Sequence, residues 1–244
     1  MSDRAYLAML LDGPLQSWGF SSRFERRTTG LHPTKSGMVG LICAAMGLPK
    51  GSAEERTVLD QLAGSRMTSI AIPRRVQSGG PPLPVLRLED YHTVLGTRRA
   101  SGKLNDDAVV TRREYLLDAR FGVVLEAPRS LLEAVAAALG HPAWGGWLGR
   151  KSCIPAEPIG RGLFDSEVEA LGQLVGNRSI DEFTTVTDVS DFAEGTDSLN
   201  DKPMSFGDAS SSGSETRRFA ARRVAVNTST RESRQSTEPQ LGDV

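Results

Sequence analysis

Residues 10–47 read LLDGPLQSWGFSSRFERRTTGLHPTKSGMVGLICAAMG and join an apolar strand to an apolar helix through a long basic loop. Residues 5–11 are apolar throughout, which predicts a buried first strand. From Thr34 onward the apolar residues recur at three- and four-residue spacing and Gly47 follows them, the pattern of a helix that ends at a glycine. The loop of residues 13–34 shows no steady period and carries arginines and hydroxyl side chains, which favours a role in binding.

Strand and helix patterns alternate up to residue 163. Ser52 and Glu55 form a capping box at the start of a second helix, which stops at Gly64. The later elements are a strand at 67–72, an alternating half-buried strand at 115–125, a helix capped by Ser130 and Glu133 that stops at Gly140, and a strand around 150–159. Strand, helix, strand, strand, helix, strand is the split βαβ order, so the predicted class is α+β and ferredoxin-like.

Residues 74–114 interrupt this order with a stretch that holds few core residues. Its ends, PVLRLEDYH and VVTRREYLL, have strand composition, whereas its middle, GTRRASGKLNDD, is rich in turn residues. A long hairpin that projects from the body fits this pattern best.

The chain changes character after residue 163. Residues 164–208 contain 11 acidic and two basic residues, which predicts a mobile acidic loop. Residues 217–228 regain strand composition and are expected to return to the body. The predicted organisation is a body of residues 1–73 and 115–163, a hairpin insertion at 74–114, an acidic, partly mobile segment at 164–228 with a possible returning strand, and a disordered tail at 229–244.

The composition is that of a globular protein, with 39% apolar and 24% charged residues. No apolar run approaches the roughly 18 residues that a membrane helix needs, so we expect no membrane partner. Two cysteines in 244 residues indicate a reducing compartment rather than a disulfide framework, which predicts a cytoplasmic protein.

The charge is unevenly distributed along the chain. Residues 1–163 carry 21 Lys and Arg against 15 Asp and Glu, whereas residues 164–244 carry 8 against 15. This segregation is typical of a protein whose first part faces a polyanion. Chance clustering in a near-neutral chain gives the same numbers, so charge alone leaves both interpretations open.

Catalytic signatures are weak. A phosphate-binding loop before Lys35 requires glycine at positions 29 and 34, where this chain has threonine, and a dinucleotide fingerprint that begins at Gly160 has Asp165 in place of its third glycine. The three histidines and two cysteines do not lie at metal-ligand spacing. The sequence therefore predicts no metal, no cofactor and no catalytic residue.

Basic and hydroxyl side chains suited to phosphate gather in three clusters. The first consists of Arg23, Arg26 and Arg27 and the helix start Thr34, Lys35, Ser36 and Gly37. The second consists of Arg150, Lys151 and Ser152, and the third, on the hairpin, of Arg98, Arg99, Lys103, Arg112 and Arg113. Helix amino termini and cationic side chains both attract phosphate. The alternative for the first cluster is a simple helix cap at Thr34 with a solvated Lys35.

Four segments together resemble the CasD family, the fifth-family CRISPR-associated subunit of the type I-E Cascade complex. These segments are GPLQSWG, PTKSGMVGLICAAMGL, EDYHTVLG…TRREYLLDARF and WLGRKSCIPAEPI, and they span about residues 5 to 163 in the same order. The resemblance implies an RNA-recognition-type body with a β-hairpin thumb. It also implies a non-catalytic subunit that binds the 5′ handle of the CRISPR RNA and caps the backbone filament, contributing to guide-directed DNA surveillance in antiviral defence.

The resemblance extends the set of site residues and names partners. Gln16 and Trp18 of the first motif join the RNA-binding residues, and Val94 and Leu95 of the thumb are expected to contact the adjacent backbone subunit or a displaced base. The implied partners are the CRISPR RNA, the Cascade backbone subunits, the large subunit and, indirectly, target DNA.

Two other functions compete with this one. Relatives of the I-C subtype cut the repeat RNA without metal, using Tyr, Lys and His, and Tyr91, His92 and Lys103 supply these residue types here. They fall in the hairpin, however, and match the I-E pattern. A stand-alone RNA-binding module leaves the hairpin and the acidic segment unexplained.

Overall fold

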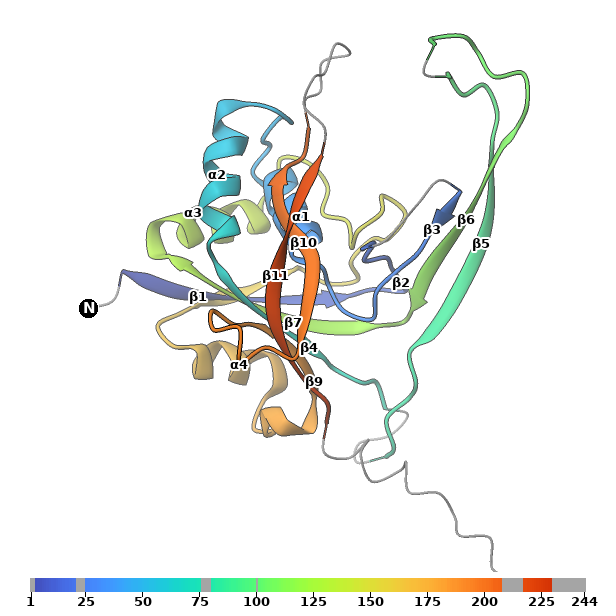
Figure 1. Ribbon diagram of the computed structural model, residues 1–244. Helices are drawn as coiled ribbons and strands as arrows, with labels where there is room; N and C mark the ends of the chain where they lie inside the picture. The colour runs from blue at the N-terminus through green and yellow to red at the C-terminus, as the bar shows by residue number, and fades with distance from the viewer. Residues whose placement is uncertain (1–2, 21–24, 76–79, 100, 208–216, 230–244) are drawn as a thin grey trace, which may run out of the picture.

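The computed structural model describes residues 3–20, 25–75, 80–99, 101–207 and 217–229 (Figure 1). The first strand, β1 (Arg4–Asp12), leads through the loop to helix α1 (Lys35–Ala45). The Thr34 side chain accepts the N–H of Gly37 and so caps α1, and α2 (Ala53–Ala63) begins at Ser52 in the same way. Gly47 has a positive φ of 69°, as expected of a glycine just past a helix end.

Seven strands form the main sheet, in the order β10-β11-β9-β4-β7-β1-β8. Besides β1, they are β4 (Arg66–Ala71), β7 (Arg120–Pro128), β8 (Gly160–Phe164), β9 (Thr184–Asp188), β10 (Asp197–Ser205) and β11 (Arg218–Asn227). Neighbouring strands are antiparallel throughout. Together with the helices, this large antiparallel sheet confirms the α+β class.

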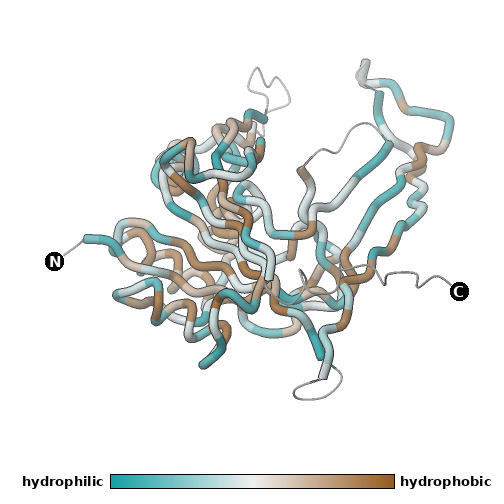
Figure 2. Tube along the Cα trace, turned by 60° about the horizontal axis from the view of Figure 1, so that its bottom comes forward, coloured by the Kyte–Doolittle hydropathy of each residue, from teal (hydrophilic) through white to brown (hydrophobic). Residues whose placement is uncertain are grey.

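Helices cover both faces of the sheet (Figure 1). Helices α1 and α3 (Arg129–Gly140) pack on one face, and α4 (Glu167–Val175) packs on the other. In β1, Leu7 and Met9 enter the core under α1 and α3, whereas Leu10 joins the cluster under α4. Successive strand side chains point to opposite faces, so a strand covered on both sides needs the continuous apolar run seen in the sequence. Figure 2 shows the hydrophobic stretches gathered in this body.

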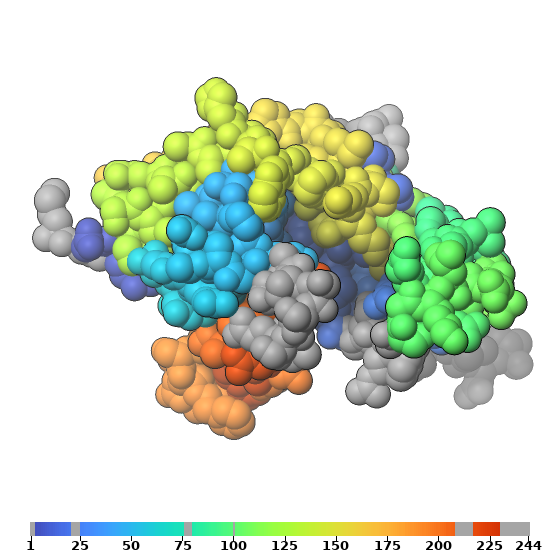
Figure 3. Space-filling model, turned by 90° about the horizontal axis from the view of Figure 1, so that it is seen from above, coloured from blue at the N-terminus to red at the C-terminus, as the bar shows by residue number. Residues whose placement is uncertain are grey.

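A second, four-stranded sheet carries the hairpin. Strands β5 (Leu86–Val94) and β6 (Val109–Leu117) pair antiparallel along their whole length. Strand β6 also pairs antiparallel with β2 (Leu15–Gln16) and parallel with β3 (Arg26–Arg27). Viewed from above, the hairpin forms a lobe beside the body (Figure 3).

Three predicted elements differ in the structure. The single strand expected at 115–125 is two strands, β6 and β7, because Asp118 turns the chain at a φ of 53°, a conformation that Asp tolerates. The strand expected around 150–159 is a loop, and β8 follows it, since Pro155 and Pro158 cannot donate to a ladder. Helix α3 begins after Pro128 without a side-chain cap, so Ser130 is not its N-cap.

The acidic segment is more ordered than its composition predicted. In place of the expected loop, residues 164–208 contain α4, a short 3₁₀ helix η1 (Ile180–Glu182), β9 and β10. Some of its acids lie in the first turn of α4, where carboxylates are favourable, and two are buried in ion pairs. Residues 218–227 form β11 of the main sheet, whereas the predicted tail after residue 229 lies outside the described residues. Within the described part, no helix is long and apolar enough to cross a membrane.

Candidate nucleic-acid interface

Gln16 and Trp18 lie inside the fold, not on an RNA-facing surface. Gln16 Nε2 donates to the carbonyl oxygens of Leu11 and Ala119 at 3.0 and 2.7 Å, and Trp18 Nε1 donates to Gln16 Oε1 at 3.0 Å. Gln16 is fully buried and Trp18 is 1% exposed. These two side chains therefore hold the start of the loop in place, and the expectation that they contact RNA directly is wrong for this structure.

Two motifs that are far apart in sequence pack backbone to backbone. The N–H of Ser17 donates to the carbonyl oxygen of Leu148 at 3.0 Å. A Cβ at Gly149 would lie 1.8 Å from the Ser17 carbonyl oxygen, and Gly149 also has a φ of 98°. A side chain at this position is excluded on both grounds. The GPLQSWG and WLGRKSCIP segments thus form one packed unit.

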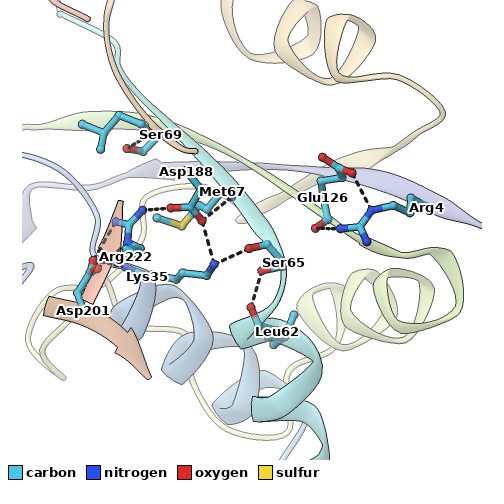
Figure 4. A network of polar contacts seen from close by, with 11 residues as sticks. Arg4, Lys35, Leu62, Ser65, Met67, Ser69, Glu126, Asp188, Asp201 and Arg222 are labelled. Atoms are coloured by element: carbon cyan, nitrogen blue, oxygen red, sulfur yellow. Dashed lines mark hydrogen bonds and ion pairs between the residues drawn. The ribbon is translucent and has the colours of Figure 1, made fainter. Parts of the chain in front are cut away.

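Lys35 is also inside the protein (Figure 4). Its side chain is 3% exposed, and Nζ lies 2.9 Å from Asp188 Oδ2 and donates to the carbonyl oxygen of Ser65. Burial lowers the pKa of Lys35, and the nearby Asp188 carboxylate opposes this shift. The ammonium is already paired within the fold, so Lys35 is not placed to bind a phosphate.

The amino terminus of α1 binds a negatively charged group, but this group is a carboxylate of the same chain and not a phosphate. Asp201 Oδ2 of β10 accepts the N–H of Lys35 at 2.8 Å. Arg222 of β11 holds the same carboxylate, with Nε–Oδ1 and Nη2–Oδ2 distances of 2.6 and 2.9 Å, and it also pairs with Asp188 (Figure 4). Thr34 is buried as the cap and Ser36 and Gly37 are half-buried in the first turn. The helix start therefore joins the C-terminal strands to the body.

The exposed cations gather where β3 meets the hairpin. In the parallel pairing of β3 with β6, Arg26 lies opposite Arg112 and Arg27 lies opposite Arg113. Arg26, Arg27 and Arg112 are exposed, and Arg113 is half-buried with its Nε 3.1 Å from Thr111 Oγ1. The structure thus brings members of the first and third clusters together at one strand junction, with Arg26 and Arg112 on one face and Arg27 and Arg113 on the other. We call these four residues the arginine row (Arg26, Arg27, Arg112, Arg113). Arg23 lies outside the described residues.

Arg150 fixes the position of this row. Its Nη1 donates to the carbonyl oxygen of Glu114 on β6 at 2.9 Å, and its Nη2 donates to that of Arg27 on β3 at 2.7 Å. The guanidinium also lies 4.7 Å from the ring centroid of Tyr115. Arg150 therefore spans the two strands that carry the row, and we assign it a positioning role. Its neighbours Lys151 and Ser152 are exposed, with Lys151 Nζ 5.6 Å from the centroid of Trp147.

The remaining residues of the expected thumb lie at the far end of the hairpin. Leu95 is 76% exposed and Val94 is half-buried. Arg98, Arg99 and Lys103 are exposed beyond the paired strands, with Arg99 Nη2 2.9 Å from Asn105 Oδ1. Among the described residues, no group of three or more His, Cys, Asp or Glu side chains is placed to hold a metal ion.

Sequence comparison identifies the family. The model of the CRISPR-associated protein family Cas_Cas5 matches residues 6–225, which is most of the chain. The chain belongs to this family. It is 36% identical over 164 residues to the CRISPR system Cascade subunit CasD of Escherichia coli (strain K12), a match that covers 64% of this chain and 70% of that protein.

Solved structures agree with this membership. This Cas_Cas5 chain resembles a chain of a CRISPR RNA-guided surveillance complex with a TM-score of 0.65 and 28% identity, over 91% of this chain and 88% of that chain. It also resembles a crystal structure of a Cas protein with a TM-score of 0.62 and 32% identity, over 93% and 96% of the two chains.

The sequence did not predict the structural role of several supporting residues of this Cas_Cas5 chain. Glu114 Oε2 accepts the N–H of Thr29 at 3.2 Å, and Thr29 Oγ1 accepts the N–H of Trp18 at 2.8 Å. These contacts join residues 85 and 11 positions apart and leave no local pattern. Arg222 did leave a signal, because it occupies the inward face of a strand on which Val224 is fully buried. A charged residue on such a face needs a buried counter-ion.

Proposed function

We propose that this Cas_Cas5 chain is a non-catalytic subunit of a type I-E Cascade complex that binds the 5′ handle of the CRISPR RNA. The kinship with the E. coli Cascade subunit and with a chain of an RNA-guided surveillance complex supports the assignment to Cascade. The arginine row is the observation that carries the binding role.

The order of the elements supports a ferredoxin-like, RNA-recognition-type body. Strands β8, β1, β7 and β4 are neighbours in that order, and all three pairs are antiparallel. Helices α1 and α2 fall between β1 and β4 along the chain, and α3 falls between β7 and β8. This is the split βαβ arrangement. The hairpin of β5 and β6 enters between β4 and β7 along the chain, so the four strands of this arrangement stay together in the main sheet.

The arginine row suits single-stranded RNA. At the junction of β3 and β6, one pair of arginines lies on each face of the ladder, and guanidinium is the side chain best shaped to hold phosphate in two parallel hydrogen bonds. Unpaired handle nucleotides can splay their bases beside such a row while their phosphates remain on the arginines. The exposed basic tip of the hairpin, with Leu95 beside it, then extends toward the guide RNA and the adjacent backbone subunit.

The nuclease alternative is not favoured by the placement of its residues. Tyr91 and His92 are successive residues of β5, so their side chains leave opposite faces of the hairpin, and Lys103 lies beyond the strands. No base and cation therefore converge on one point among Tyr91, His92 and Lys103. The two cysteines, Cys43 and Cys153, are free and buried, and burial raises the pKa of the Cys43 thiol to about 12, so this thiol is not a nucleophile at neutral pH.

The partners and location that we propose follow from the same assignment. We propose that the chain contacts the CRISPR RNA, the Cascade backbone subunits and the large subunit, and that it reaches target DNA only indirectly, as part of antiviral defence. A cytoplasmic location accords with two free cysteines.

Charge reversal in the arginine row tests the binding role. We expect Arg26→Glu with Arg27→Glu to weaken binding of a single-stranded handle RNA and to reduce the slope of log affinity against log salt by about 1.4, since each lost phosphate contact removes about 0.7. A matched control reverses the charges of two exposed residues, Lys50 just before α2 and Arg56 in its first turn. Equal effects of both variants, or none from either, would reject the interface.

A further inference from the structure

A small depression in the outer half of the paired hairpin strands, beside β3, has the composition of a nucleotide site. It has a volume of about 330 Å³ and is lined by Glu25, Arg26, Tyr91, Val110 and Arg112. This volume falls at the lower end of the roughly 300–1,000 Å³ of small-molecule sites, so it suits one nucleotide better than a longer segment.

Three of these side chains form a row across three strands. Tyr91 on β5 lies opposite Arg112 on β6, and Arg112 lies opposite Arg26 on β3. Residues that are directly opposite in a ladder project from the same face of the sheet. The Tyr91 ring and two guanidinium groups therefore share one face. Tyr91 is 65% exposed, which leaves its ring open to a ligand.

The rest of the depression has a defined position too. Val110 lies opposite Thr93, one step along the same face from Tyr91 and Arg112, and gives the depression an apolar wall. The carbonyl oxygen of Glu25 accepts the N–H of Arg112 at 2.9 Å, which fixes the Glu25 backbone at the edge of β6. Arg112 Nη1 forms an ion pair with Glu89 Oε1 at 3.7 Å, which is too long for a hydrogen bond, so a phosphate would compete with this carboxylate for the guanidinium.

Each of these groups matches one part of a nucleotide. Aromatic rings and guanidinium planes stack on unpaired bases, and arginines hold phosphate. An ionised carboxylate only accepts hydrogen bonds. Guanine presents two adjacent N–H donors on its Watson–Crick edge, at N1 and N2, whereas adenine and cytosine present a donor beside an acceptor. A carboxylate therefore pairs with guanine at both oxygens and with the other bases less well.

We propose that this depression holds one unpaired guanosine nucleotide of the bound RNA. The base stacks on Tyr91, the phosphate lies between Arg26 and Arg112, and the Glu25 carboxylate accepts the N1 and N2 protons of guanine. This inference rests on the proposed RNA-binding function and adds base selectivity to it.

The test measures binding of labelled oligouridylates of handle length that contain one central guanosine, adenosine, cytidine or inosine. For the wild-type protein we expect the guanosine oligomer to bind about tenfold more tightly than the adenosine or cytidine oligomer. Inosine lacks the N2 amine, so we expect it to lie between them. Glu25→Gln should bring the guanosine and adenosine affinities together, although it removes a negative charge and strengthens binding to RNA in general.

Tyr91→Ala and Tyr91→Phe separate stacking from other effects. We expect Tyr91→Ala to weaken binding of the guanosine oligomer about tenfold and Tyr91→Phe to restore it, because the phenyl ring still stacks. Both variants should unfold at the wild-type temperature, since the side chain is on the surface.

The outcomes distinguish this inference from the function on which it rests. Salt-dependent binding with no base preference, or with a preference that survives Glu25→Gln, overturns the guanosine site and leaves the RNA-binding function intact. A wild-type protein that binds none of the oligomers nor the full handle RNA overturns both.

Discussion

Lys35 Nζ and Asp188 Oδ2 lie 2.9 Å apart inside the protein, and this pair connects the first helix of the body to a strand formed about 150 residues later. Asp188 also pairs with Arg222, and Arg222 pairs with Asp201, so four charged residues form one buried network. The network joins the C-terminal strands to the body. Lys35, which the sequence placed among the phosphate-binding candidates, therefore has a structural role.

Replacement of Lys35 tests this structural role. We expect Lys35→Met to lower the free energy of unfolding by about 3 kcal/mol, because the carboxylate of Asp188 then loses a buried partner. Urea denaturation measures the effect. Lys50→Met, at an exposed lysine, is the matched control and should change stability by no more than about 0.5 kcal/mol. A stable Lys35→Met protein with reduced RNA affinity would restore Lys35 to the RNA-binding set.

His32 gives the fold a pH dependence of known sign. Burial lowers the pKa of His32 below its ordinary value of 6.5, and the charge of Arg222 lowers it further. The unfolded chain therefore binds the proton more readily, so stability is complete above pH 6.5 and declines as the pH falls from 6.5 toward the lowered pKa.

A His32 variant separates the contribution of this histidine to the pH dependence of stability from that of the carboxylates. His32→Gln should reduce the loss of stability between about pH 7 and pH 5, measured by thermal unfolding at a series of pH values. His141→Gln, at an exposed histidine, serves as the control. Identical pH profiles for wild type and His32→Gln would show that His32 titrates alike in the folded and unfolded chains.

Arg150 is expected to act through the strands that it joins. Arg150→Lys retains the charge but cannot reach both the Glu114 and the Arg27 carbonyl oxygens, and losing one hydrogen bond of this kind amounts to about 1–2 kcal/mol. We expect several-fold weaker RNA binding and faster hydrogen exchange at the Arg112 amide, which bonds to Glu25 beside β3. Lys151→Ala should leave that exchange rate unchanged. Weaker binding without faster exchange would instead make Arg150 a direct RNA ligand.

The hairpin tip is expected to serve assembly, not folding. The β5–β6 ladder ends at the pair Val94 and Val109, so replacing residues 96–107 with a short Gly-Ser turn removes only the region beyond it. The isolated protein should unfold as the wild type does. We expect the yield of the complex with the backbone subunit and guide RNA, measured by native mass spectrometry, to fall. Assembly at wild-type yield would remove the thumb role.

Local signals in the sequence predicted most of the elements but not how they meet. The caps at Thr34 and Ser52 and the strand at 217–228 could be predicted because each depends on neighbouring residues. The alternating pattern continues through Asp118, because a single turn residue does not interrupt it, so the sequence did not reveal the turn there. The acidic composition of residues 164–208 did not reveal the helix and strands that they form.

The candidate site shows the same division. Arginine clusters were evident in the sequence, but their union depends on the parallel pairing of β3 with β6, which no local pattern encodes. Gln16, Trp18 and Lys35 are polar or amphipathic, and residue type alone does not reveal that each has partners inside the fold.

The most direct test of the account is to map the contacts of the 5′ handle by photo-crosslinking. The chain is assembled with its partner subunits and repeat-derived RNA that carries a photoreactive base at each handle position in turn, and the crosslinked peptides are identified by mass spectrometry. The account predicts intact RNA, with crosslinks in residues 25–27 and in the hairpin strands at 86–94 and 109–117. Cleaved RNA, or crosslinks confined to the acidic segment at 164–207, would contradict it.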